Sequence, residues 1–216
     1  LRDKAIVSAH VKRLLNTQNG KNKVIDNISR WSLTDKVNGF SAVPDTLKEG
    51  INMDLLGDAM VNEARKFIEY IVYEKQGSFK ELVTSKDSFA SHTGLASIYG
   101  HEPYNGTIPK IMAGKRQGIL LRAPFLTWPS TRTSIIHRGV DFQKRVLCND
   151  IPDPDVDISD QRDDVVLSNN ELFQMSNREI IRQKTQSPLC MSCHSVINPT
   201  GLSLIHISEP TRLPGI

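Results

Sequence analysis

Hydrophobic residues recur every three or four positions along most of the chain, and this spacing predicts a mostly α-helical protein. The first such segment covers residues 3–17 and places its apolar side chains on one face. Those side chains are Ile6, Val7, Val11, Leu14 and Leu15. A polar turn at residues 16–23 is expected to lead into a second helix, whereas residues 39–50 lack the periodicity and are expected to be irregular. The apolar side of the second helix should carry Val24, Ile28 and Trp31.

The longest periodic stretch, residues 54–76, predicts the central helix of the fold. Its apolar stripe consists of Leu56, Met60, Ala64, Phe67, Ile68, Ile71 and Val72. Asn52 or Asp54 is expected to cap the first turn of this helix. Gly77 is expected to end it, because glycine adopts the left-handed backbone of a helix terminus without strain.

Shorter helices are expected at residues 79–83 and 91–99, followed by a loop at residues 100–115 that contains several glycines and prolines. The apolar run at residues 119–121 fits either a buried strand or a helix end, and its periodicity does not decide between them. Residues 134–148 return to helical spacing. One side of that helix is expected to hold Ile136, Val140, Gln143 and Leu147, with Ile135, Phe142 and Val146 nearby.

Residues 149–170 change character, because prolines and a set of aspartates indicate an extended acidic linker. Asp153, Asp155 and Asp157 imitate the opening of a calcium-binding loop. Such a loop requires a glycine where this chain has Ile158, and it requires a bidentate glutamate that is also missing. A solvated linker without tight calcium binding is therefore the preferred interpretation.

A last helix is predicted to begin at Ser176, because Ser176 and Glu179 have the spacing of a capping box. Pro188 is expected to stop this helix. Rigid backbone would then lead directly into Cys190-Met191-Ser192-Cys193-His194, the stretch with the most specific chemistry in the chain.

The C-x-x-C-H pattern is typical of covalent haem c attachment. Two thiols must add to the two vinyl groups of one haem, and two intervening residues place both sulfurs on one side of a single backbone turn. His194 follows directly and would bind the iron through a neutral imidazole nitrogen. The sequence therefore predicts a haem c site in which Cys190 and Cys193 form the thioethers and His194 is the iron ligand.

Two other interpretations of the motif stay open. A structural zinc site needs two more ligands, and only Cys148 remains among the cysteines. A dithiol redox site needs a strand before the motif and a helix after it, whereas a helical pattern precedes this motif and Asn198-Pro199-Thr200-Gly201 follows it. Cys148 is expected to be a small buried apolar residue, with a contact to the haem surroundings as the alternative.

The sequence does not identify a sixth haem ligand. The candidates are His10, His92, His101, His137, Met60, Met112 and Met175. A single histidine is more often a surface or hydrogen-bonded core residue, and a methionine on an apolar stripe more often packs in the core. Core packing is therefore the preferred role for Met60, and His137 is the most interesting histidine because it stands beside Arg138-Gly139.

Composition narrows the functional classes. The chain has 216 residues, 27 of them basic and 24 acidic, and its net charge of +3 gives no reason to expect nucleic acid or an anionic membrane as a partner. No apolar run is long enough to span a bilayer. Three cysteines are too few for a disulfide framework. Because the sequence starts at Leu1, we expect an interior fragment, and a missing signal peptide does not argue for the cytoplasm.

Several short segments occur in an order that resembles the planctomycete-type cytochrome c-like secreted proteins, whose C-terminal parts are domains of unknown function. The segments are residues 95–100, 118–121 with 123–126, 132–134, 138–139, 145–148 with the proline-rich stretch that follows, and the C-x-x-C-H motif with residues 198–201. The resemblance covers roughly residues 55–201. It implies a mostly helical fold, export from the cytoplasm and covalent haem at Cys190, Cys193 and His194. Asn198 departs from the family, which usually has Asp-Pro-x-Gly at this point.

After Gly201 the chain reads Leu202-Ser203-Leu204-Ile205-His206-Ile207-Ser208-Glu209-Pro210-Thr211-Arg212, which looks like a translated sequencing adapter. The residues from about Leu202 are expected to be non-native and to pack on nothing. The predicted organisation is therefore a helical bundle-like domain at 1–148, the acidic linker at 149–170, the start of a haem c-binding segment at 171–201 and a tail at 202–216.

Three functions fit these predictions. The leading one is a haem c module that transfers electrons to a redox partner protein in the periplasm or at the cell surface. The second is an exported redox enzyme, or a subunit of one, linked to polysaccharide breakdown. The third is a non-catalytic scaffold that haem or a metal stabilises. No catalytic triad, phosphate-binding loop or paired carboxylates are apparent in the sequence, so an enzymatic reaction is left undecided.

Overall fold

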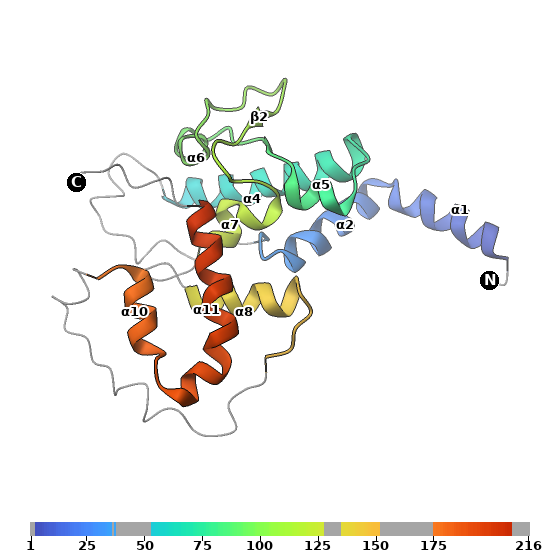
Figure 1. Cartoon of the computed structure of the whole chain (residues 1–216). Coiled ribbons are helices and arrows are strands. Elements are labelled where there is room, and N and C mark those ends of the chain that lie inside the picture. Colours follow the sequence, from blue (N-terminus) through green and yellow to red (C-terminus); the bar gives the residue numbers. More distant parts are fainter. Residues whose placement is uncertain (1–2, 36, 38–52, 128–134, 152–174, 209–216) are drawn as a thin grey trace. The chain divides into compact units, whose positions relative to one another are not determined.

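The computed structural model describes residues 3–35, 37, 53–127, 135–151 and 175–208 (Figure 1). The chain is mostly helical, as its periodicity predicts. It divides into two compact units, Leu1–Pro129 and Ser130–Ile216. The predictions for residues 39–50, for the caps Asn52 and Asp54 and for most of the acidic linker fall outside the described residues and side chains. Within the described part of the chain, no helix is long and apolar enough to cross a membrane.

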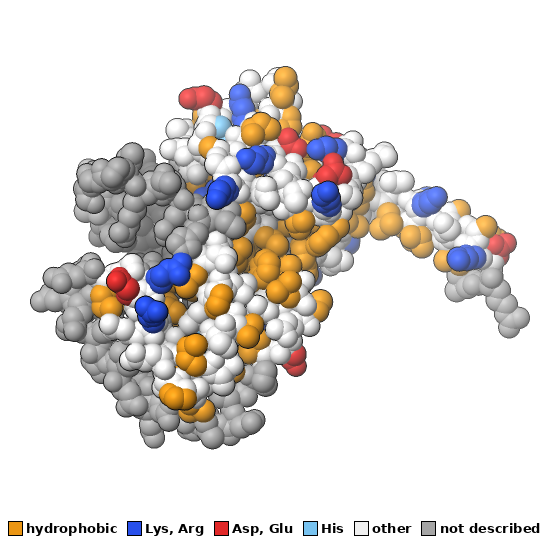
Figure 2. All heavy atoms as spheres, in the orientation of Figure 1, with side chains coloured by type: hydrophobic (Ala, Val, Ile, Leu, Met, Phe, Trp, Pro, Cys, Tyr) orange, Lys and Arg blue, Asp and Glu red, His pale blue; other side chains and the backbone are white. Residues whose placement is uncertain are grey.

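The first unit begins with α1, Lys4–Leu15, and α2, Gln18–Trp31. The polar turn expected at residues 16–23 is wrong, because α2 starts at once. The Thr17 side chain accepts a hydrogen bond from the Gly20 N–H over 3.1 Å and so caps the new helix. α1 forms as predicted but buries none of its residues, and Figure 2 shows hydrophobic side chains along its surface.

α2 turns a slightly different side inward than its periodicity predicts. Ile25 and Ser29 are buried. The predicted apolar residues Val24, Ile28 and Trp31 are only half-buried. An ion pair of 2.7 Å between Asp26 and Arg65 links α2 to α4, Met53–Glu69.

The central helix of the first unit is α4, Met53–Glu69, which continues as the π-helix η1, Tyr70–Glu74 (Figure 1). The predicted apolar stripe is confirmed, since its residues are buried except for the half-buried Val72. The helix ends at Glu74, slightly earlier than predicted, and the predicted left-handed position is wrong by one residue. Gln76, and not Gly77, takes the left-handed backbone, with φ of 51°.

Short elements follow α4: α5 (Phe79–Thr84), β1 (Asp87–Ser88), α6 (Thr93–Tyr99), β2 (Lys110–Ile111), the 3-10 helix η2 (Ile119–Leu121) and α7 (Ala123–Leu126). The helices predicted between residues 79 and 99 are confirmed. The region predicted as a loop, residues 100–115, contains β2, which pairs antiparallel with β1. The apolar run at 119–121 forms η2, so the helical alternative was the right one.

A buried ion pair joins α4 to the start of α7. Glu63 and Arg122 contact each other, and both side chains are almost fully buried. Arg122 also donates to the Asp87 carbonyl over 2.6 Å and lies 3.5 Å from the centre of the Phe67 ring. The Tyr99 hydroxyl donates to Glu63 over 3.4 Å. The interior of the first unit is therefore polar at this point, and protein groups surround the charges.

The second unit contains α8, Ile135–Arg145, α10, Asn177–Lys184, and α11, Pro188–Ser208 (Figure 1). The capping box at the start of α10 is confirmed, because Ser176 Oγ accepts from the Glu179 N–H over 3.3 Å and Glu179 accepts from the Ser176 N–H over 2.8 Å. α8 packs on α11, whereas the sequence-based division placed it in the first domain.

Two glycines allow α8 and α11 to approach closely. A Cβ atom on Gly139 would collide with the backbone oxygen of Ile197. One on Gly201 would collide in the same way with the backbone oxygen of Ile135. The side of α8 that was predicted to be buried is wrong in part. The buried residues are Ile135, Arg138, Gly139 and Gln143, while Leu147 is exposed.

α11 continues beyond Gly201 as far as Ser208. Leu204 is only 7% exposed, so the prediction that residues after about Leu202 pack on nothing is wrong for this side chain. The non-native origin of the tail stays a prediction.

Candidate functional site

The C-x-x-C-H motif lies in the first turns of α11. Pro188 was expected to stop the preceding helix, but α10 ends before it and Pro188 is the first residue of α11. Proline is well suited to a first helical position, because the N–H that it lacks would have no partner there. The helix that begins at Pro188 therefore continues past the motif. The expected lack of a helix after the motif was one of two arguments against a dithiol redox site, and the structure removes it. The described residues that precede the motif, 175–187, contain a helix and no strand.

On a helix, positions separated by three and four residues share one face. Cys190, Cys193 and His194 have this spacing, and all three side chains are half-buried. The two cysteines are one turn apart, about 4.5 Å along the helix axis. Both are free thiols. The structure thus places the three predicted residues on one side of a single helix.

The imidazole of His194 begins a chain of hydrogen bonds that crosses to the end of α10. Its Nδ1 lies 2.9 Å from Asn198 Oδ1, one helical turn further along α11. Asn198 Nδ2 lies 2.9 Å from Thr185 Oγ1. Thr185 Oγ1 in turn lies 2.7 Å from the backbone oxygen of Ile181. We refer to these four residues as the His194 relay.

The chemistry of its last member fixes the direction of the His194 relay. A carbonyl oxygen only accepts, so the Thr185 hydroxyl donates its single hydrogen to Ile181. Thr185 must then accept from the Asn198 amide, whose NH₂ group is the donor. This orientation leaves Asn198 Oδ1 facing His194 as an acceptor, and Nδ1 of His194 carries the ring proton. In the neutral imidazole, Nε2 keeps its lone pair.

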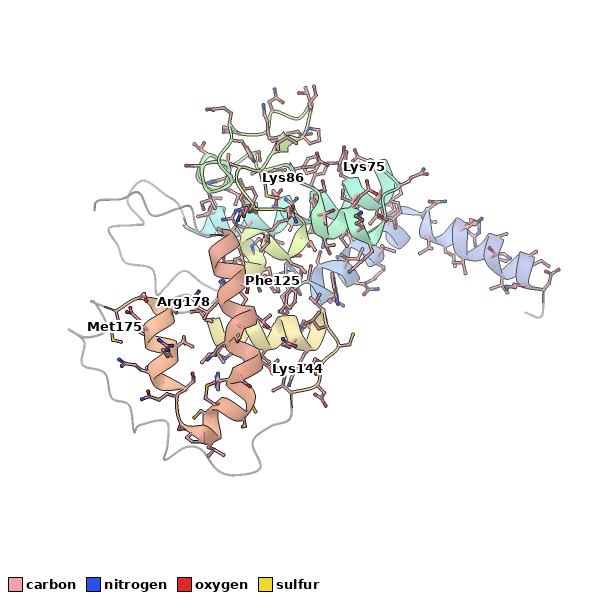
Figure 3. The ribbon with its side chains drawn as sticks, in the orientation of Figure 1. Lys75, Lys86, Phe125, Lys144, Met175 and Arg178 are labelled. Atoms are coloured by element: carbon pink, nitrogen blue, oxygen red, sulfur yellow. The ribbon has the colours of Figure 1, made fainter. Side chains whose placement is uncertain are left out.

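A cavity of about 950 Å³ lies between α10 and α11, and His194 and Met191 form part of its wall on α11. Arg178, labelled in Figure 3, and Arg182 line it from α10. Neither cysteine belongs to the wall. No described residue donates a hydrogen bond to Nε2 of His194, so this nitrogen remains able to bind a metal.

Cys148 is exposed, so the prediction of a small buried residue is wrong. It lies beyond the end of α8 and takes the left-handed backbone with φ of 52°. The chain then bonds back to α8, because the Asn149 N–H donates to the Gln143 carbonyl over 2.9 Å. The alternative role of Cys148, a contact with the haem surroundings, stays a prediction.

The structure assigns ordinary roles to several candidates for the sixth ligand. Met60 and Met112 are buried in the core of the first unit, which confirms the preferred role of Met60. His92 caps α6 by accepting from the Gly94 N–H over 3.1 Å. Both ring nitrogens of His101 form hydrogen bonds, to Glu102 and Ser88.

The other three candidates lie at or near the surface of their helices. His10 is exposed on α1, and His137 is exposed on α8. Met175 is half-buried just before α10, in the same unit as the motif (Figure 3). Among the described residues, no three His, Cys, Asp or Glu side chains are grouped as a metal site, and the aspartates of the calcium-like sequence lie outside them.

Sequence reasoning missed Thr185 and Asn198. Residues 198–201 were not expected to be helical, although Pro199 lies inside α11. The available signal was the four-residue spacing between His194 and Asn198, which becomes meaningful only if the helix continues through Pro199. Thr185 could not be found from spacing, because it contacts Asn198 across a change of helix.

Two families match the chain. Residues 116–209 match the family described as PSCyt3, Protein of unknown function (DUF1588). Residues 1–101 match the family described as PSD4, Protein of unknown function (DUF1592). No curated protein and no solved structure matches. The chain is therefore similar, over most of its length, to two families of unknown function whose names associate them with planctomycete cytochrome c proteins.

Proposed function

We propose that the chain is a haem c-binding module that transfers electrons. Cys190 and Cys193 hold the haem covalently, and His194 binds its iron. The observation that carries this proposal is the His194 relay, because it leaves Nε2 without a proton on an imidazole that lines a cavity. Ligating histidines in proteins are commonly arranged in this way, with the second ring nitrogen donating to a fixed acceptor.

The residues of the site fit a covalently attached haem. Each thiol adds across one vinyl group, so that sulfur bonds to one carbon and hydrogen to the other, and no oxidant or reductant is consumed. The cavity wall combines apolar side chains, including Ile181 and Met191, with the two arginines of α10. When bound, the haem supplies one-electron chemistry, and the axial ligand and the surrounding wall set its potential.

The partners and the location of the module are part of the same proposal. The family resemblance implies export, so we place the module in the periplasm or at the cell surface. An electron-transfer module needs a second redox protein as its partner.

Haem staining after denaturing gel electrophoresis tests covalent attachment. The 216-residue chain is expressed with an export signal in cells that have the haem-attachment machinery. We expect a stained band for the wild type, weaker or absent staining for Cys190→Ala and Cys193→Ala, and full staining for the control Cys148→Ala. An unstained wild type, from cells that mature a control cytochrome, contradicts haem attachment.

The optical spectrum of the loaded protein tests electron transfer. A six-coordinate, low-spin iron is expected, because both axial positions are filled in most electron-transfer haems. His194→Ala should change the spin state, because it removes the axial ligand that α11 supplies. An iron with an open coordination position would contradict electron transfer and favour an enzymatic reaction instead.

A further inference from the structure

We propose that Asn198 and Thr185 are positioning residues that hold His194 as a single tautomer before any ligand binds. The inference has two parts. The first concerns the protein alone: the His194 relay fixes the proton on Nδ1 and so leaves Nε2 unprotonated on an imidazole that lines the cavity. The second rests on the proposed function: the neutral Asn198 amide sets how strongly His194 donates electrons to the haem iron.

The burial of Thr185 fixes the hydrogen bonds of the His194 relay. Thr185 follows the last residue of α10 and is only 3% exposed. A buried hydroxyl without partners is costly, so both of its bonds are needed. It donates to Ile181 and accepts from Asn198, and these two bonds use its hydrogen and one of its lone pairs. The Asn198 amide is therefore held in one of its two flipped orientations.

The same orientation has a consequence for the imidazole. An imidazole free in water exchanges its proton between both nitrogens, and either tautomer is accessible. If Asn198 were flipped, its NH₂ group would face His194 Nδ1, and that nitrogen would have to accept. Thr185 prevents this flip, because its oxygen faces Asn198 as an acceptor. A residue four positions from the motif on α11 and a residue at the end of α10 thus decide which nitrogen of His194 is free to bind iron.

The charge of the acceptor controls the strength of the ligand. A neutral amide oxygen polarises the Nδ1–H bond less than a carboxylate does. A stronger acceptor gives the imidazole more negative character, which stabilises the oxidised iron more than the reduced iron. The variant Asn198→Asp keeps the shape of the side chain and changes the acceptor to a carboxylate. It is therefore the direct test of the second part of the inference.

Nitrogen NMR of the haem-free chain tests the first part. Spectra are recorded in alkaline buffer, where imidazoles are neutral, and His194 is assigned by its loss in His194→Ala. We expect the Nδ1–H tautomer in the wild type, and mixed or Nε2–H tautomers in Asn198→Leu and, to a smaller extent, Thr185→Val. Thr185→Ser should restore the wild-type spectrum. Circular dichroism confirms that each variant keeps its helices.

Two matched controls make the same chemical changes elsewhere. Asn62→Leu changes an exposed asparagine on α4. Thr84→Val removes a hydroxyl that also donates to the carbonyl four residues earlier, at 2.7 Å. Neither should alter the His194 spectrum. A wild-type His194 that averages both tautomers, or an Asn198→Leu variant that keeps Nδ1–H, would overturn the inference, whether or not haem binds.

Redox titration of the loaded chain tests the second part. Asn198→Asp should lower the midpoint potential, with an effect of about tenfold in the ratio of oxidised to reduced protein, which is about 59 mV for one electron. An unchanged or raised potential contradicts the tuning role. If no haem attaches, the proposed function fails, but the NMR result still decides the first part of the inference.

Discussion

The two units bury polar side chains in different ways. In the first unit, Glu63 and Arg122 lie in the interior, where the Asp87 carbonyl, the Tyr99 hydroxyl and the Phe67 ring surround them. In the second unit, the buried Thr185 starts a chain of hydrogen bonds that ends at a ring nitrogen beside a cavity. Protein groups surround the Glu63–Arg122 pair, and we call this a closed arrangement. The His194 relay instead ends at an imidazole whose Nε2 has no hydrogen-bond partner among the described residues.

This difference separates a structural role from a ligand-binding role. A closed buried ion pair fixes how α4, β1 and α7 meet, and its loss should affect stability. A chain of hydrogen bonds that ends at an imidazole nitrogen, like the His194 relay, adds little to the packing of the unit. Its loss should affect the chemistry of that nitrogen and leave the fold largely intact. The comparison therefore predicts large stability effects in the first unit and ligand-specific effects at the His194 relay.

Breaking the buried ion pair should have the largest effect. Glu63→Leu leaves the Arg122 guanidinium buried without its counter-charge, and we expect a loss of about 3–5 kcal/mol in the free energy of unfolding. Urea unfolding followed by circular dichroism measures it. The control Lys66→Met breaks exposed ion pairs on the same helix, at 2.7 Å to Glu74 and 3.3 Å to Glu69. Its cost should stay below about 1 kcal/mol, and equal costs for both variants would refute the closed arrangement.

Filling the helix crossing in the second unit should come next. Gly139→Ala places a methyl group against the Ile197 backbone, and we expect a loss of about 1–3 kcal/mol. Hydrogen exchange of peptides from α8 and α11 should show weaker protection. The control Gly94→Ala meets its nearest atom, in the His92 ring, at 3.3 Å and should cost less. Unchanged protection in Gly139→Ala would contradict the close crossing.

Tyr99 gives the closed arrangement a pH dependence. Burial raises the pKa of its hydroxyl above the ordinary value of 10.0, and the nearby Glu63 carboxylate adds to this. Above about pH 10 the unfolded chain releases this proton while the folded chain keeps it, so the stabilisation is complete below pH 10 and is lost as pH rises. Tyr99→Phe should cost about 1–2 kcal/mol near neutral pH, because the Ala123 N–H loses its acceptor at 3.0 Å.

The measurement for Tyr99 is the difference between wild type and variant in the free energy of unfolding, taken from pH 8 to pH 11. Taking the difference removes the contribution of other groups that titrate there. We expect the advantage of the wild type to shrink above about pH 10. A constant difference across this range would contradict a raised pKa for a buried hydroxyl.

The smallest effect is expected at Cys148. It is exposed, lies beyond α8 and is not part of the cavity wall. Cys148→Ala should leave the helix content and covalent haem unchanged, and only the count of reactive thiols in the haem-free chain should fall by one. Thiol titration and haem staining measure both. Loss of haem in this variant would show that the site extends to the end of α8.

Much of the fold could be predicted from periodicity. The apolar stripe predicted for α4 and η1 was correct, because seven apolar residues at helical spacing all lie on the same face of a helix. Helix ends were less predictable, since Thr17 and Pro188 start helices where turns or stops were expected. A side-chain cap or a proline fits both the end of one helix and the start of the next, and only the tertiary fold decides between them.

The site could be predicted only in part. Spacing selected Cys190, Cys193 and His194 as candidates, and the structure places them on one side of α11, while their role in haem attachment stays a prediction. The partners of His194 could not be found in this way, since Thr185 contacts Asn198 across two helices. The ion pair between Glu63 and Arg122 was missed for the same reason. A charged residue in an apolar segment does not indicate, from the sequence alone, which distant residue it pairs with.

Mass spectrometry of the intact, denatured protein tests the central claim most directly. The chain, produced with an export signal and the haem-attachment machinery, should gain the mass of one haem. The double variant with Cys190→Ala and Cys193→Ala should gain none, while Cys148→Ala should match the wild type. A wild-type chain that carries no added mass, from cells that mature a control cytochrome, or a double variant that still carries haem, would contradict the account.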